Sequence, residues 1–296
     1  MTIFLDLKIR HDQDFLRKNK RMGSPLNNES KEYLESELQI ISKWENEQKG
    51  LWFWEKIGRL PFKLLDKATP AFIQDKIALL LDELGSFVQS GGQYLTKEQS
   101  VFKRIEGYVP GESITSVDDC ANVSLLVMNS VSEDIKKANS KLATVQGAST
   151  GIGGIFTLSI DIPLLLSLSL KTLQDISLAY GFDPKDKEER IFMVKCLQFA
   201  TADIVGKEAI LNDLSSFHRN EQADRKEMVS QLQGWREVVY TYRDQFGWKK
   251  LLQMIPIAGM VFGAFTNRSM IADVAEVGSM LYRKRRIMMR LEAKID

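Results

Sequence analysis

Apolar residues recur along this chain at the spacing of helices rather than of strands. In residues 30–54 they fall three or four positions apart, on one face of an amphipathic helix. The alternation of β-branched and polar residues that marks half-buried strands does not occur in the sequence. The pattern therefore predicts an all-α protein. The apolar positions of the first helix are Leu34, Leu38, Ile41 and Trp44.

Short motifs predict where several helices begin and end. Thr96 and Gln99 have the spacing of a capping box, in which two side chains satisfy the free backbone donors of a helix start. We expect another helix from about residue 116 to residue 145. Gly181 is placed to end a helix, because glycine adopts the left-handed conformation just past a C-terminus. The Asp-Pro pair at 183–184 is then expected to open the next helix.

One long stretch of the chain is almost uncharged. Between Lys141 and Lys171 lie 29 residues with a single charged side chain, Asp161. Glycines and one proline divide the stretch into two short pieces, which predicts a helical hairpin with glycines that allow close packing. We expect Asp161 to be the N-cap of the second helix, with the proline in its first turn. The dividing residues are Gly147, Gly151, Gly153, Gly154 and Pro163.

A second uncharged segment, residues 251–267, contains Pro256, Gly259 and Gly263. The two glycines are four positions apart, a spacing that lets two helices approach closely in lipid or in a dry core. A mean hydropathy of −0.19 excludes a polytopic membrane protein. Each Gly/Pro-rich hairpin could be buried core or could dip into a bilayer, and the sequence leaves both open.

The chain is predicted to form one large helical domain behind a short arm. Residues 1–29 are mixed and polar, so we expect them to be a loose arm. Residues 30–296 are expected to form the domain. Its amphipathic N-terminal helices, over residues 30–110, would pack on the Gly-rich C-terminal part.

Composition narrows the class of protein. Apolar residues make up 44% and charged residues 27% of the 296, as in folded globular proteins. A net charge of +1 gives no general attraction to nucleic acid, so we expect no such partner. Cys120 and Cys196 are expected to be buried thiols. Asp6 and Lys8 interrupt the apolar residues of the N-terminus, which excludes a secretory signal and predicts a cytoplasmic protein.

Catalytic motifs do not occur in the sequence. No lysine follows the glycines at 151–154 until Lys171, so a phosphate-binding loop is excluded. His11 and His218 are the only histidines, too few for a zinc enzyme. We expect no catalytic residue, metal or cofactor, and a non-enzymatic protein is favoured. The alternative is a soluble helical protein that binds lipid or another hydrophobic ligand, or an enzyme, with its site between the two hairpins.

Two basic segments are candidates for contact with an anionic membrane surface. The first combines tryptophans with cations, which suits a headgroup interface, and the second is a run of four cations near the C-terminus. The alternative is that the tryptophans pack in the core and the cations complement a helix C-terminus. The first segment comprises Trp52, Trp54, Lys56, Arg59 and Lys63, and the second Arg283, Lys284, Arg285 and Arg286.

The order of these motifs resembles that of EcsC family proteins. It runs from the glycines at 151–154 through Asp161-Ile-Pro163 and Tyr180-Gly181-Phe182-Asp183 to Ile255-Pro256-Ile257. The likeness covers about residues 30 to 290. It implies an all-helical bacterial protein, peripheral at the inner face of the cell membrane, whose partner is the membrane surface or a membrane protein such as an ABC transporter. It implies no reaction, and the oligomeric state is left open.

Overall fold

The structure, a computed structural model, describes residues 29–48, 95–152, 155–201 and 256–294 and four single positions between 207 and 214. Within these ranges the side chains at 150–163, 201 and 256–266 are not described. The basic aromatic segment at 52–63, both histidines, Gly153 and Gly154 lie outside the described residues, and so does the arm up to residue 28.

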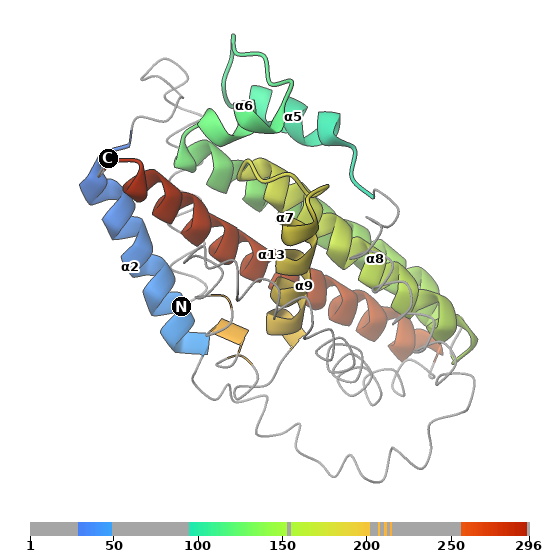
Figure 1. The fold of residues 1–296 in the computed structure, drawn as a ribbon. Coiled ribbons are helices and arrows are strands. Elements are labelled where there is room, and N and C mark those ends of the chain that lie inside the picture. The colour runs from blue at the N-terminus through green and yellow to red at the C-terminus, as the bar shows by residue number, and fades with distance from the viewer. Residues whose placement is uncertain are drawn as a thin grey trace.

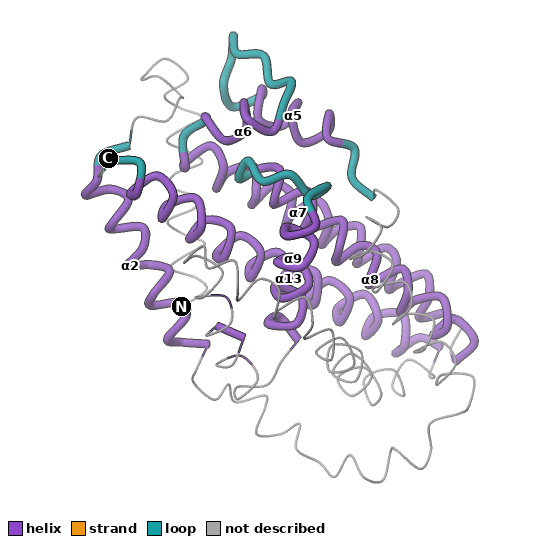
Figure 2. The backbone as a smooth tube through the Cα atoms, viewed as in Figure 1, coloured by secondary structure: helices purple, strands orange, loops and turns teal. Residues whose placement is uncertain are grey.

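The described residues form seven helices and no strand, so the all-α prediction is confirmed. The same helices are seen as tubes in Figure 2. They are α2 (Lys31–Gln48), α5 (Glu98–Glu106), α6 (Val117–Asn122), α7 (Leu125–Ile152), α8 (Ile155–Ala179), α9 (Lys187–Thr201) and α13 (Pro256–Glu292).

The long helix α13 lies at the centre of the arrangement (Figure 1). It contacts α7, α8, α9 and α2, and α5 and α6 lie across one end of the α7–α8 pair. α7 and α13 run antiparallel, because Ser132 bonds Ser279 at 2.5 Å while Lys136, one turn later, pairs with Glu276 at 3.5 Å. α8 returns beside α7, with two residues between their ends.

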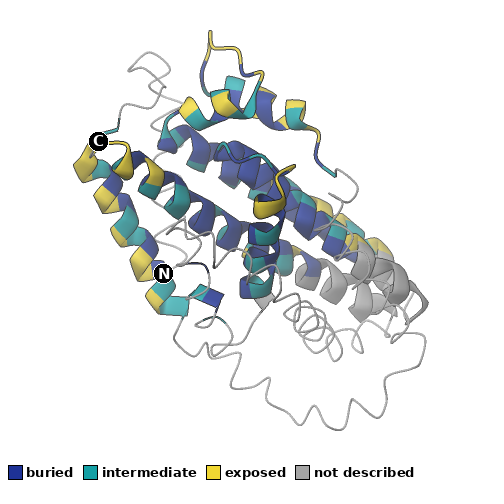
Figure 3. Ribbon diagram, in the orientation of Figure 1, coloured by how far each residue is buried: buried dark blue, intermediate teal, exposed yellow. Residues whose placement is uncertain are grey.

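The hydrophobic core lies between α7, α8 and α13, where buried residues concentrate (Figure 3). Each helix contributes apolar side chains three or four positions apart, the spacing that keeps them on one face. Full burial of such a side chain contributes about 1.5–3 kcal/mol. Core residues of these helices include Met128, Val131, Ile135, Leu173, Ile176, Val274, Val277 and Leu281.

Gly181 ends α8 as expected. Its φ of 73° is left-handed, its N–H donates to the carbonyl of Leu178 at 2.9 Å, and the N–H of Phe182 donates to Ser177 at 2.8 Å. These two bonds are those of a Schellman motif. A Cβ at position 181 would lie 2.5 Å from the Cα of Ala121, so glycine is required here by packing as well as by conformation.

Two predicted helix starts are wrong. α8 begins at Ile155, so Asp161 and Pro163 lie in its interior and Asp161 is not the N-cap. The apolar run before Asp161 continues the helix, although a proline inside a helix removes one backbone bond. The Asp183-Pro184 pair precedes α9 by a turn, in which the Asp183 side chain accepts the N–H of Lys185 at 2.9 Å, and the helix begins at Lys187.

The capping box was also predicted at the wrong place. α5 begins at Glu98, and its N-cap residue Lys97 makes no side-chain cap bond. Thr96 is buried, and its hydroxyl donates to the carbonyl of Lys171 at 3.4 Å. A capping box does occur at the start of α6, where Ser116 accepts the N–H of Asp119 at 3.1 Å and the Asp119 carboxylate accepts that of Ser116 at 2.9 Å.

The predicted glycine motifs lie within helices where the structure describes them. Gly147 and Gly151 fall in the last turns of α7, which extends to Ile152 instead of ending near 145. Pro256 is the first residue of α13, the position where its missing N–H costs least. Gly259 and Gly263 lie in the following turns. Gly278, farther along α13, meets α8 closely, because a Cβ there would lie 2.7 Å from Leu173 Cδ2.

Candidate functional site: the arginine segment of α13

The cations at 283–286 lie inside the protein, each beside a different structural partner. Successive residues of a helix point about 100° apart, so four adjacent side chains cannot form one face. Arg283 and Lys284 reach α2, Arg285 reaches α9, and Arg286 reaches the end of α8. The segment expected to meet lipid headgroups is therefore not displayed as an exposed cationic surface in this fold.

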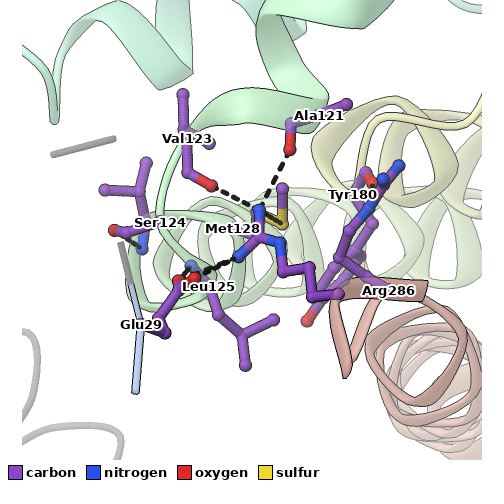
Figure 4. Close-up of polar contacts among 10 residues, drawn as sticks. Glu29, Ala121, Val123, Ser124, Leu125, Met128, Tyr180 and Arg286 are labelled. Atoms are coloured by element: carbon purple, nitrogen blue, oxygen red, sulfur yellow. Dashed lines mark hydrogen bonds and ion pairs between the residues drawn. The ribbon is translucent and has the colours of Figure 1, made fainter. Parts of the chain in front are cut away.

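Arg290, one turn beyond this segment, joins three parts of the chain. Its partners Glu29, Ala121 and Val123 are labelled in Figure 4. Its Nη1 donates to both carboxylate oxygens of Glu29, at 2.8 and 2.9 Å. Its Nη2 donates to the carbonyls of Ala121 and Val123 at 3.0 and 2.7 Å, where α6 ends and carbonyls lack helical partners. Burial lowers the pKa of Arg290, and the charge of Glu29 opposes that shift.

Glu29 also completes the start of α7. Its Oε1 accepts the N–H of Leu125, the first residue of that helix, at 2.5 Å. Ser124 accepts the N–H of Val127 at 3.4 Å, so two side chains share the free donors of this helix end. The carboxylate is placed where the helix dipole favours negative charge.

Arg286 caps the C-terminal end of α8. Its Nε and Nη2 donate to the carbonyls of Tyr180 and Gly181, both at 2.8 Å, and its guanidinium lies 4.5 Å from the ring centre of Phe182. Burial, and then the charges of Arg290 and Arg285, lower the pKa of Arg286 to about 10. The side chain stays charged near neutral pH and acts as a cap supplied by another helix.

The guanidinium of Arg285 packs against aromatic rings. Its guanidinium carbon is 4.3 Å from the ring centre of Phe182 and 4.2 Å from that of Phe192, and Tyr282 lies farther away at 5.6 Å. Both terminal nitrogens bond the carboxylate of Glu189, at 2.7 and 2.6 Å. Burial lowers the pKa of Arg285, but the hydrogen bonds and charge of Glu189 outweigh it and hold the pKa above its ordinary value.

A line of ion pairs and a hydrogen bond joins α2 to α13. The Glu37 carboxylate pairs with Arg283, Glu45 pairs with Lys284 at 2.7 Å, and Trp44 Nε1 donates to Glu276 at 3.0 Å. We call this contact, with the Glu29–Arg290 pair at its end, the α2–α13 seam. On α13 the polar members at 276, 283 and 290 are seven residues apart, which returns them to one helix face.

Apart from this segment, polar groups are buried between α7 and α8. Asn139 donates to Thr172 at 3.0 Å and to Asp175 at 3.4 Å, and Lys171 bonds the same oxygen of Asp175 at 2.5 Å. These contacts tie the two helices together by hydrogen bonds across their interface. The other carboxylate oxygen of Asp175 is buried and has no partner among the described residues.

The two cysteines are buried thiols, as expected. Cys120 lies on α6 and Cys196 on α9. Burial, reinforced by the charge of Asp119, raises the pKa of Cys120 to about 12, and burial also raises that of Cys196. Both thiols are therefore neutral at physiological pH and are poor nucleophiles.

Within the described ranges no group of three or more His, Cys, Asp or Glu side chains is placed to hold a metal ion. No described helix combines the length and the apolar character needed to cross a membrane.

Apolar side chains are exposed on the described parts of α7 and α8 that approach the connection between these two helices. Of the residues whose side chains are described, four large apolar ones are exposed, and three of them lie here. They are Leu142 (52% exposed), Val145 (68%) and Leu164 (45%). We call residues 142–164 the hairpin tip. It belongs to the uncharged stretch identified in the sequence.

Sequence reasoning found the basic segment but not its carboxylate partners. Glu29 was not singled out, and nothing in the sequence paired Glu37 or Glu189 with these cations, because glutamates on amphipathic helices usually face solvent. One signal was available for Glu37. It lies on the apolar face of α2, three residues after Leu34 and four before Ile41, where an unpaired charge would be costly.

Comparison with known proteins places the chain among bacterial relatives. The model of the EcsC protein family matches residues 35–287. The chain is 56% identical over 264 residues to the uncharacterized protein YdbA of Bacillus subtilis (strain 168), covering 89% of this chain and 96% of that protein. It is 31% identical over 188 residues to Protein EcsC of the same strain, covering 63% of this chain and 76% of that protein. No solved structure matches the chain.

Proposed function

Because the chain belongs to the EcsC protein family, we propose that it is a non-enzymatic accessory protein that associates with the inner face of the cell membrane through its hairpin tip. The observation that carries this proposal is the exposure of Leu142, Val145 and Leu164 on an uncharged stretch. Several large apolar side chains exposed on the same part of a helix pair are typical of a surface that meets lipid or another protein.

The dimensions of the tip suit shallow insertion. Leu142 and Val145 lie ten and seven residues before the end of α7, and Leu164 lies nine residues after the start of α8. At about 1.5 Å per residue, these positions are roughly 10–15 Å from the helix ends. The hydrocarbon core of a bilayer is about 30 Å thick, so a tip of this depth would remain within one leaflet.

The contacts of the arginines on α13 support a non-enzymatic role. Arg285 and Arg286 of the basic segment, and Arg290 beyond it, bind carboxylates and helix-end carbonyls. A catalytic cation needs a free face toward a substrate, and these side chains are used to hold helices together. The family resemblance adds the class of partner, a membrane protein such as an ABC transporter, to the proposal.

The alternative, a hydrophobic-ligand carrier or an enzyme with its site between the two hairpins, depends on the side chains at 155–170 and 251–265. Of these, the structure describes only the side chains at 164–170. The alternative therefore stays a prediction.

Flotation of the full chain with neutral phosphatidylcholine vesicles at low and high salt tests the proposal. We expect binding that survives high salt, because apolar insertion is not screened. The triple variant Leu142→Gln, Val145→Gln and Leu164→Gln should lose most of this binding while keeping its helical circular dichroism, because glutamine is a good helix former.

Met289→Gln is the control. Met289 is also exposed (49%), but it lies near the C-terminal end of α13, away from the hairpin tip. This variant should float like the natural chain. If the triple variant floats as well as the control, or if the natural chain does not bind vesicles, the tip is not a membrane contact.

A further inference from the structure

The α2–α13 seam contains charge where two packed helices usually have only apolar residues. Four buried residues follow heptad spacing along α2, namely Leu34, Glu37, Ile41 and Trp44. On α13 the same spacing runs through Glu276, Met280, Arg283, Ile287 and Arg290. The Glu37–Arg283 pair therefore occupies a core layer, with side chains that are 3% and 10% exposed.

A charged layer of this kind holds α2 in one position without adding much stability. Desolvation of two buried charges offsets most of their attraction, and an apolar pair of similar size would often hold the helices more tightly. Buried polar pairs instead specify which register and which partner are accepted. α2 is thus docked specifically, through two of its own carboxylates, Glu37 and Glu45, and through Glu29 just before it, each paired with a cation of α13.

The face of α13 that α2 covers combines cations with apolar side chains. Arg283 and Lys284 lie on it beside the apolar side chains of Met280 and Ile287. A helical face that combines cations with apolar side chains suits the interface of an anionic membrane. The carboxylates of α2 neutralise these cations as long as the helix remains docked.

We infer that α2 is a releasable acidic cover, and that its release presents the basic and apolar face of α13 to an anionic lipid surface. The hairpin tip would make the first, charge-independent contact, and the uncovered face of α13 would add a second, charge-dependent one. This inference rests on the proposed membrane association, but it concerns a different surface.

The experiment compares two variants that change the net charge equally. Glu37→Gln with Glu45→Gln removes two carboxylates from the seam, and Glu32→Gln with Glu35→Gln removes two exposed ones from the same helix. Binding is measured on phosphatidylcholine vesicles with and without phosphatidylserine. Two uncovered cations at about 1 kcal/mol each should tighten binding to the anionic vesicles on the order of tenfold or more for the seam variant only, and high salt should abolish the gain.

Hydrogen exchange of the natural chain provides a test that does not depend on the stability of a variant. On phosphatidylserine vesicles the amides of α2 should lose protection, while those in the core of α7 and α8 keep it. Equal binding by the two variant pairs, or undiminished protection of α2 on the vesicles, would overturn the inference. Failure of the proposed membrane contact is seen separately, as a lack of tip-dependent binding to neutral vesicles.

Discussion

At the scale of single residues, glycine is required where α8 ends against α6. Gly181 combines a φ of 73° with a backbone neighbour, whereas Gly111 has a φ of 97° and open space around its Cβ direction. Gly111→Ala should therefore cost only the strain of a left-handed alanine, about 1–2 kcal/mol. Gly181→Ala should cost this strain and about 1–3 kcal/mol more, because the methyl group meets Ala121.

Urea denaturation of both variants measures the two costs, with Gly111→Ala as the control for strain alone. Equal free energies of unfolding for the two variants would show that the α6–α8 contact can relax around a methyl group.

At the scale of elements, the register of α2 on α13 depends on the Glu37–Arg283 pair. Glu37→Met should destabilise the protein by about 3–5 kcal/mol, because it leaves a buried guanidinium without its carboxylate. The double variant Glu37→Met with Arg283→Met should recover most of that loss, since two apolar side chains fill the same layer. A double-mutant cycle by denaturation yields the coupling free energy between the two positions.

The outer pair of Lys31 and Glu35 is the matched control on the same helix. Its side chains are 59% and 53% exposed, so its cycle should give less than about 1 kcal/mol. A coupling between Glu37 and Arg283 as small as that of this exposed pair would contradict a core role for the buried layer.

At the scale of the whole molecule, the two thiols show whether α6 and α9 unfold together with the core. Cys120 on α6 and Cys196 on α9 are buried, and a pKa of about 12 leaves only about one Cys120 thiol in ten thousand ionised at pH 8. Neither cysteine should react with a thiol-specific disulfide reagent in the native protein. In denaturant both should become reactive at one midpoint, because α6 and α9 pack on the same core.

Cys120→Ala and Cys196→Ala assign the signal to each site, and the midpoint is compared with that of helical circular dichroism. A thiol that reacts well before the loss of helix would show that its helix opens separately from the core.

Much of the helical architecture follows from the sequence alone. Apolar spacing predicts helices, and Gly181 marks the end of α8, because local conformation decides both features. The helix starts at Asp161 and Thr96 were predicted wrongly for the converse reason. A capping side chain is effective only where the helix begins. α8 begins six residues before Asp161, and Thr96 is buried before the start of α5.

The role of the basic segment was decided by tertiary structure. A run of four cations specifies charge and composition, but their directions around α13 determine what each one meets. Their acidic partners come from distant parts of the chain, as does Glu29, which lies 261 residues from Arg290. The sequence by itself determined the helices, the family and the presence of the charges. Only the packing of α2, α8 and α9 around α13 decided that these charges hold the fold together, because pairing depends on distances in space that the order of residues does not contain.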